Sequence, residues 1–296
     1  MAQFRLGQLL PDLYKELGQL NVSVATGGST TTIADTKLVG RYADGVWIEG
    51  AAGVIYDAGG AGATPQNEFN RISNYVDSTG TLTVDTAFVG TPASGDVFWF
   101  ANEFYPLRIL VELINDGLRS LGDITLVDTT TLDTAVQQTE YAASVTWKHR
   151  RPRAIAYQGR TGDANDNRWI QIHDVDFIPA AGGSTGLIIL PQLPATRDIR
   201  VIYEDSHPRL SIYSDSVNEA INPQLAIKAC AVQALQWQNS RLQGSDTAIL
   251  QRLNQAQADL ALAKGDLRPY KYQKRRKIFS VGGSHIDEDE FQVPTG

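Results

Sequence analysis

Residues 106–122 read PLRILVELINDGLRSLG, and this stretch has the clearest structural pattern in the chain. Pro106 suits the first turn of a helix, because the N–H that proline lacks would have no helical partner there. Gly122 supplies the left-handed residue that commonly ends a helix. The apolar residues between them are spaced so that they share one helical face: Leu107, Leu110, Val111, Ile114, Leu118 and Leu121. The pattern predicts an amphipathic helix that buries this face.

Three further segments have helical patterns. Leucines at alternating spacings of four and three residues form an N-terminal stripe, and Pro11 within it limits the predicted regular helix to about 11–17. Asn222 and Pro223 suit the start of a helix that runs toward residue 239 and is apolar on more than one side. Gly244 separates it from a last striped helix, so these two are expected to form an antiparallel hairpin.

Two regions between the helices have β character. They contain short runs rich in Thr, Val, Ile and aromatic residues, separated by Gly and Asn/Asp clusters. In the first region the expected strands are 30–38, 46–56, 67–76, 81–86 and 96–101. In the second region they are 140–146, 153–158, 167–173, 186–190 and 198–204.

The predicted fold class is therefore α+β. A helical core is expected to consist of the N-terminal helix, the central helix and the C-terminal helical hairpin, with two inserted antiparallel β regions and an extended C-terminal arm. The expected division is a helical core over 1–21, 102–122 and 216–265, a first β domain over 22–101, a second β domain over 123–215 and an arm over 266–296.

Composition narrows the function classes. The chain has 296 residues, a net charge of -7 and 42% hydrophobic residues, which predicts a folded protein without a generally DNA-coating surface. Its single cysteine, Cys230, cannot form an internal disulfide, so assembly in a reducing cytoplasm is expected. The N-terminus has no signal-peptide pattern, and no stretch approaches the roughly 20 apolar residues that span a bilayer.

Catalytic and metal motifs are weak. The chain has four histidines and no Gly-x-Ser-x-Gly element, so an enzyme is not expected, and neither is a cofactor. Asp163, Asn165, Asn167 and Asp174 are spaced like the ligands of a calcium loop. Arg168 stands where that loop needs glycine, and the flanks read as strands, so an ordinary polar turn is the preferred interpretation and no metal is expected.

Two features suggest binding. Five tryptophans (Trp47, Trp99, Trp147, Trp169 and Trp237) could stack on sugars, although most lie on predicted strands where burial is the rule. The arm alternates basic and aromatic residues: Arg268, Tyr270, Lys271, Tyr272, Lys274, Arg275, Arg276, Lys277 and Phe279. It is interpreted as a tether to a neighbouring subunit or ring, with a solvated tail and nonspecific DNA contact as alternatives. Arg150, Arg151 and Arg153 form a possible secondary basic contact.

The order of these elements resembles the head-to-tail adaptor, or connector, proteins that form the neck ring beneath the portal of tailed bacteriophages. Two stretches carry the likeness. The first is 104–124, a helix that ends in a Leu-Gly-Asp-Ile turn. The second joins 199–204, 207–210 and 221–227 to the alanine-rich hairpin. The first β region is larger than a minimal helical adaptor would contain. A different position in the neck or tail therefore remains an alternative.

The resemblance implies a structural virion protein, assembled in the host cytoplasm and located in the neck. A homo-oligomeric ring of about twelve copies would link the portal to the tail or to further neck proteins. Such a ring needs heterologous contacts between neighbouring copies, and it closes when the rotations between copies add up to a full turn. The ring would line the DNA exit channel with only transient DNA contact, and it would not bind a membrane. The alternative is a receptor- or glycan-binding decoration protein of the neck or tail.

Overall fold

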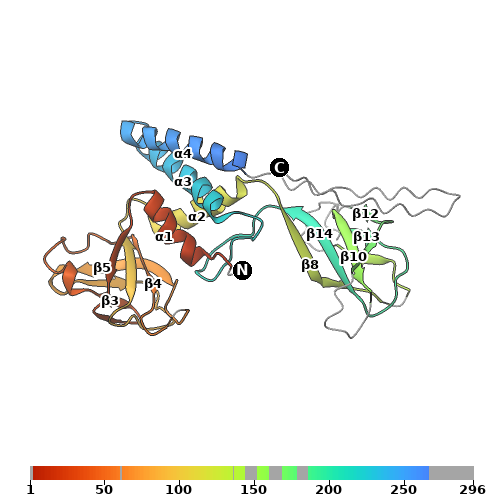
Figure 1. The fold of residues 1–296 in the computed structure, drawn as a ribbon, viewed down its shortest axis with the longest axis horizontal. Coiled ribbons are helices and arrows are strands. Elements are labelled where there is room, and N and C mark those ends of the chain that lie inside the picture. The colour runs from red at the N-terminus through yellow and green to blue at the C-terminus, as the bar shows by residue number, and fades with distance from the viewer. Residues whose placement is uncertain are drawn as a thin grey trace, which may run out of the picture.

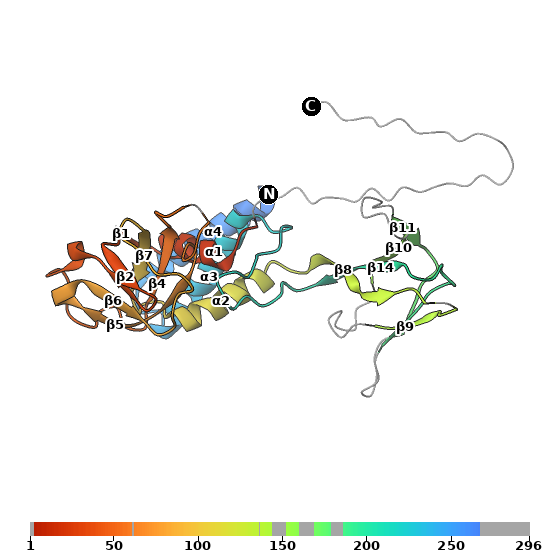
Figure 2. The ribbon, with the colours of Figure 1, turned by 90° about the horizontal axis from the view of Figure 1, so that it is seen from below.

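The structure, a computed structural model, describes residues 3–60, 62–135, 137–143, 152–159, 169–178 and 186–266. It contains a seven-stranded sheet, a layer of four α-helices and a second β unit made of two smaller sheets. Figure 1 shows the helices between the two β parts, and Figure 2 shows the second β unit standing apart at one end. The molecule is therefore elongated.

The expected fold class is wrong. Within the described residues, fourteen strands form three antiparallel sheets and only four α-helices are present, so the chain is β-rich and not a helical-core α+β fold. The physical reason is that the β regions have hydrophobic clusters of their own. A helical scaffold with β insertions would have concentrated the buried apolar residues between helices, whereas here they lie in three places.

The seven-stranded sheet closes on itself. Its order is β1-β7-β4-β5-β6-β3-β2, and only Ala25 and Thr26 separate the two edge strands along the chain. The Ala25 N–H donates to Asp96 O on one side, and the Thr26 N–H donates to Ala34 O on the other. The sheet is thus a small barrel. Its strands are β1 (Asn21–Val24), β2 (Gly27–Ser29), β3 (Thr32–Ala34), β4 (Ala51–Tyr56), β5 (Phe69–Val76), β6 (Thr81–Val84) and β7 (Val97–Ala101).

Two predicted strands are clearly shorter than expected. The run 46–56 forms a strand only at Ala51–Tyr56, after a turn. The run 30–38 forms a strand only at Thr32–Ala34, followed by a 3-10 turn at Thr36–Leu38. Asp35 causes the change, because its side chain accepts a hydrogen bond of 2.9 Å from the Lys37 N–H. The Asp35 carboxylate also accepts a hydrogen bond of 2.5 Å from the Ser23 hydroxyl. It therefore joins strand β1 to the segment that follows β3.

Strand β7 is buried on both faces. Phe98 and Phe100 point into the barrel, whereas Trp99 and Ala101 face the helices, as period-two alternation requires. The Trp99 ring lies 5.3 Å from that of Tyr14 on the first helix, measured between centroids. This strand therefore joins the barrel to the helical layer.

The helices pack around a central one. They are α1 (Leu6–Glu16), α2 (Leu107–Arg119), α3 (Pro223–Arg241) and α4 (Thr247–Asp266). Helix α3 contacts the other three, which explains why its apolar residues are not confined to one side.

The predicted start of α1 is wrong. Helix α1 begins at Leu6 and includes Pro11, because its first N–H groups are held by the carbonyls of Asp215 and Tyr213.

The second β unit lies between α2 and α3 in the sequence. One sheet has the order β11-β10-β14-β8 and the other β12-β13-β9. Ten buried apolar residues form a cluster within this unit. Four strands were not among the predicted ones: β8 and β12 of this unit, and β1 and β2 of the barrel. The strands are β8 (Ile124–Asp133), β9 (Glu140–Ala142), β10 (Ala154–Gln158), β11 (Trp169–Ile172), β12 (Asp176–Ile178), β13 (Leu187–Ile189) and β14 (Asp198–Asp205).

Candidate functional site

Most of the predicted site residues lie outside the described residues. This applies to the basic and aromatic residues of the arm from Arg268 to Phe279, to Arg150 and Arg151, and to Asp163, Asn165 and Asn167 of the calcium-like turn. Arg153 is described. Its guanidinium lies 2.5 Å from the carboxylate of Glu204, and both side chains are about half exposed. Arg153 therefore has a local ion-pair partner on the neighbouring strand.

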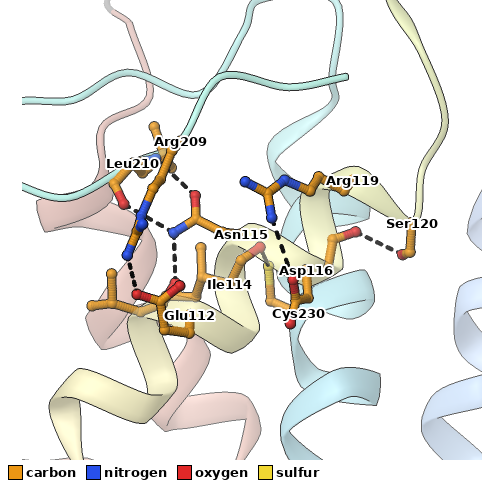
Figure 3. A network of polar contacts seen from close by, with 11 residues as sticks. Glu112, Ile114, Asn115, Asp116, Arg119, Ser120, Arg209, Leu210 and Cys230 are labelled. Carbon is orange, nitrogen blue, oxygen red and sulfur yellow. Dashed lines mark hydrogen bonds and ion pairs between the residues drawn. The ribbon is translucent and has the colours of Figure 1, made fainter. Parts of the chain in front are cut away.

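A polar network attaches the loop after β14 to helix α2 (Figure 3). Asn115 is 2% exposed, and its amide donates to Leu210 O at 2.9 Å while its carbonyl accepts from the Leu210 N–H at 2.7 Å. Arg209 forms an ion pair with Glu112 one turn earlier on α2. The loop is therefore fixed by two side chains of helix α2.

His207 and Asp215 hold the same loop from within. The Asn218 N–H donates to His207 Nε2 at 2.9 Å, so the ring proton sits on Nδ1 and donates to Pro208 O at 2.6 Å. Burial lowers the pKa of His207, and its hydrogen bond to Pro208 opposes that shift. The Asp215 carboxylate accepts from the N–H groups of Ser211 and Ile212. These bonds fix the conformation of the loop, and they bring no reactive groups together.

A hollow of about 510 Å³ lies between the barrel and the C-terminal end of α3. The barrel contributes Tyr42, Val46 and Trp47, the segment before α2 contributes Phe104, and α3 contributes Gln238 and Arg241. The rings of Tyr42 and Phe100 both meet that of Trp47 edge to face, at 5.0 and 4.8 Å between centroids. The hollow thus has a rigid aromatic side and a helical side.

Two residues that line this hollow each have a buried polar atom without a hydrogen-bond partner in the structure: the indole Nε1 of Trp47 and the amide oxygen of Gln238. Gln238 is 1% exposed although it is polar. Native proteins leave few buried polar groups unpaired, so such groups call for a physical explanation. The hollow is the strongest candidate binding site among the described residues. The sequence offered one weak signal, a glutamine on a nearly all-apolar side of a helix.

The second β unit presents another candidate surface. On the four-stranded sheet, the Arg200 guanidinium lies 5.3 Å from the centre of the Trp169 ring. Cross-strand pairing places Gln158 opposite Trp169, and Ala156 between Gln171 and Arg200. These residues share the face of the sheet turned away from Ile155 and Ile199, which are buried in the unit's cluster. The face combines one partly exposed aromatic ring with hydrogen-bonding side chains.

The other tryptophans differ from Trp169. Trp47 and Trp99 are buried, and Trp237 is partly buried on α3, where the Arg241 guanidinium lies 5.6 Å from its ring centre. Trp147 lies outside the described residues. Among the described residues no three His, Cys, Asp or Glu side chains are grouped to hold a metal ion, and no helix is long and apolar enough to cross a membrane.

Comparison with known protein families and with curated proteins found no match to this chain.

Proposed function

We propose that this chain is a head-to-tail adaptor subunit of a tailed bacteriophage, a structural virion protein of the neck. Copies of it would form a ring between the portal and the tail and would surround the path of the DNA. In this role the protein binds and connects its partners and carries out no reaction. The arm from Arg268 to Phe279 would be the tether to the portal or to a neighbouring subunit.

The observation that carries the proposal is the arrangement of the three parts. The barrel is packed on the helices through Trp99 and Tyr14, whereas the second β unit is joined to them by the paired strands β8 and β14 (Figures 1 and 2). An elongated subunit with β surfaces at both ends can contact different partners at each end. This form suits a linking protein better than it suits a single enclosed site.

Exposed leucines on helix α4 support the proposal that copies of the chain form a ring. In the described residues it packs mainly on α3, and Leu250 and Leu262 remain 42% and 69% exposed. A helix whose outer side still carries exposed leucines can pack against a neighbouring copy. The net charge of -7 suits a channel through which DNA slides without strong attachment.

Electron microscopy of the purified chain, alone and mixed with portal and tail material, tests this proposal. We expect closed rings that bind portal, and we expect a chain truncated after Gly265 to remain folded but to lose portal binding. A full chain that stays monomeric in the presence of portal would contradict the ring. A truncated chain that docks as well as the full chain would contradict the tether alone.

Glycan binding through the second β unit is a second candidate function. The specific observation is Trp169, the partly exposed tryptophan that shares a sheet face with Arg200 and two glutamines. A glycan array would show binding that is lost in Trp169→Ala and kept in Trp237→Phe. An array without signal would remove this function.

A further inference from the structure

We propose that the ring forms by packing of the outer face of helix α4 in one copy against the outer wall of strands β1, β7 and β4 in the next copy. The outer face consists of the uncharged exposed residues of α4, the helix at the top of Figure 1. The outer wall is the part of the barrel that exposes Val22, Val24 and Tyr56. This inference rests on the proposed ring, and it identifies the two surfaces that meet in it.

The outer face of α4 differs from the exposed sides of α1 and α2. At 3.6 residues per turn it covers about half of the helix circumference, and its residues are Thr, Ala, Leu, Gln, Asn and Gly. The exposed charged residues within 247–265 are Arg252 and Lys264, which lie at the two margins of this face. In contrast, the exposed sides of α1 and α2 carry seven charged residues: Asp12, Lys15, Glu16, Arg108, Glu112, Asp116 and Arg119. Because charged residues are depleted in the core of an interface, the outer face has the composition of a contact surface.

The outer wall of the barrel is also uncharged. Strands β1, β7 and β4 are neighbours, and none of their residues is charged. Val24 and Tyr56 both pair with Val97, and Val22 lies two residues before Val24 on β1, so these side chains share one side of the sheet. Val22, Val24 and Tyr56 are 53%, 38% and 46% exposed. The acidic residues that flank β4 and β7 are buried: Asp57 and Asp96.

The ring and the charge of the chain identify what covers each surface. A closed ring is built from heterologous contacts, so each copy needs two different surfaces that fit each other. The barrel meets α1, α1 meets α3, and α3 meets α4, so the outer wall and the outer face belong to different parts of the subunit. Every copy has a net charge of -7, and two uncharged surfaces avoid the repulsion that like charges would cause between copies. DNA would instead require cations, which neither surface presents in the described residues.

The end of α4 near Gly265 is the apolar part of the outer face. Ala258, Ala261 and Leu262 are all exposed there and lie together, because residues three and four apart share a helical face. Leu262 is 69% exposed, and its small neighbours let it project from the helix. The valines of the outer wall offer an apolar surface for this side chain. We therefore place the centre of the contact at Leu262.

A charge swap in the full chain tests which surfaces meet. Leu262→Asp places a carboxylate in the contact from the α4 side, and Val22→Lys places an ammonium group in it from the barrel side. Each single variant should raise the protein concentration at which rings form by at least about tenfold, because a charge without a partner is costly to bury. The double variant gives every contact one charge of each sign, so it should restore the rings. Mass photometry and electron microscopy measure the assembled fraction. Circular dichroism should show that all variants are folded, since both side chains are more than half exposed.

Val127→Lys is the matched control, because Val127 is 55% exposed on β8 of the second β unit, outside both surfaces. An equal loss of rings in this control would contradict the assigned contact. Rings that persist in both single variants, or a double variant that stays dissociated, would also contradict it. Rings restored by mixing Leu262→Asp chains with Leu262→Lys chains would overturn the proposal and show that α4 packs on α4. An unsubstituted chain that stays monomeric in the presence of portal would contradict the proposed ring together with this contact.

Discussion

Asn115 shows how one side chain can position a whole loop. It lies among the buried residues of α2 and satisfies both backbone groups of Leu210, at 2.9 and 2.7 Å (Figure 3). A third bond of 2.8 Å joins its amide to the carbonyl of Val111 within the helix. The sequence placed Asn115 beside the apolar stripe, and only the fold revealed the segment that it binds, 95 residues further along the chain.

Replacing Asn115 by Leu should lower the free energy of unfolding by about 2–6 kcal/mol. The substitution leaves the N–H and the carbonyl of Leu210 buried without partners, and each unmade bond costs about 1–3 kcal/mol. Denaturation in urea measures the change. The neighbouring Asp116→Asn is the control, because its exposed ion pair with Arg119 at 3.6 Å contributes under about 1 kcal/mol. Equal losses in the two variants would contradict the role of Asn115.

His207 should make stability depend on pH. Its pKa is lowered in the folded chain because burial disfavours the imidazolium, whereas the unfolded chain takes up a proton near the ordinary value of about 6.5. Above that pH both states are neutral, so His207 contributes no pH dependence. Below it the unfolded state alone binds the proton, and stability falls by up to about 1.4 kcal/mol per pH unit until the folded pKa is reached.

Urea denaturation at pH 7.5, 6.5 and 5.5 would measure this effect. His207→Gln keeps an acceptor for the Asn218 N–H but does not titrate, so its curve should be flatter than that of the original chain over the same range. A variant that loses stability between pH 6.5 and 5.5 as steeply as the original chain would show that another group is responsible.

At the scale of elements, Gly117 decides how closely α2 and α3 approach. A Cβ atom at this position would lie 2.8 Å from the Cα of Cys230 and 2.9 Å from its backbone nitrogen. Both positions are helical, so neither backbone can move without shifting a helix. Ordinary helix propensity would favour alanine here by about 1 kcal/mol, so the glycine reflects packing.

Gly117→Ala should therefore destabilise the chain by about 2 kcal/mol or more, since overpacking outweighs the gain in propensity. Adding Cys230→Ala should not restore stability, because the clash is with backbone atoms. Gly265→Ala on α4 has no atom within 4 Å of the added carbon and should be neutral or stabilising by up to about 1 kcal/mol. Rescue by Cys230→Ala would show that the sulfur alone sets the distance.

The elements could be predicted from the sequence to different degrees. Helix α2 and the hairpin of α3 and α4 are confirmed, because their signals are local: a proline at the start, an apolar stripe and a glycine at the break. The start of α1 depends on bonds from Asp215 and Tyr213, which no local pattern contains. Strand β8 was missed because the polar run 128–131 interrupts its apolar pattern, and the segments 124–128 and 132–133 become a strand through pairing with β14.

At the scale of the whole molecule, the second β unit enters and leaves the rest of the chain at one place. Ile124 at the start of β8 pairs with Asp205 at the end of β14, so the two connections lie side by side. The apolar cluster of the unit is drawn from residues between these two points. The unit thus has the form of an insertion into the loop between α2 and the segment that leads to α3.

Deleting residues 125–204 and joining Ile124 to Asp205 with an Asn-Gly turn should leave the remaining chain folded. Paired residues in antiparallel strands lie about 5 Å apart, so a two-residue turn can span the gap. Circular dichroism should show the helical signal retained, and unfolding should stay cooperative. Loss of the helical signal would mean that the unit is required for the helical layer to fold.

The hollow between the barrel and α3 also depends on the arrangement of the whole molecule. The sequence placed Trp47 on the predicted strand 46–56, Tyr42 shortly before it and Gln238 on a buried helix, but nothing in the sequence relates them. They meet because β7 presents Trp99 to α1, which orients the barrel against the helices. A site formed by separate elements depends on that orientation, so its residues could not be grouped in advance.

The sequence by itself determined where the longer helices lie and which residues they bury, because helical periodicity and capping act within a few turns of the chain. The tertiary structure alone decided that the β regions have hydrophobic clusters of their own, that the first sheet closes between Val24 and Gly27, and that Trp47 and Gln238 share a hollow. Strand pairing and site formation join residues far apart in sequence, and their free energy depends on partners that no local pattern specifies.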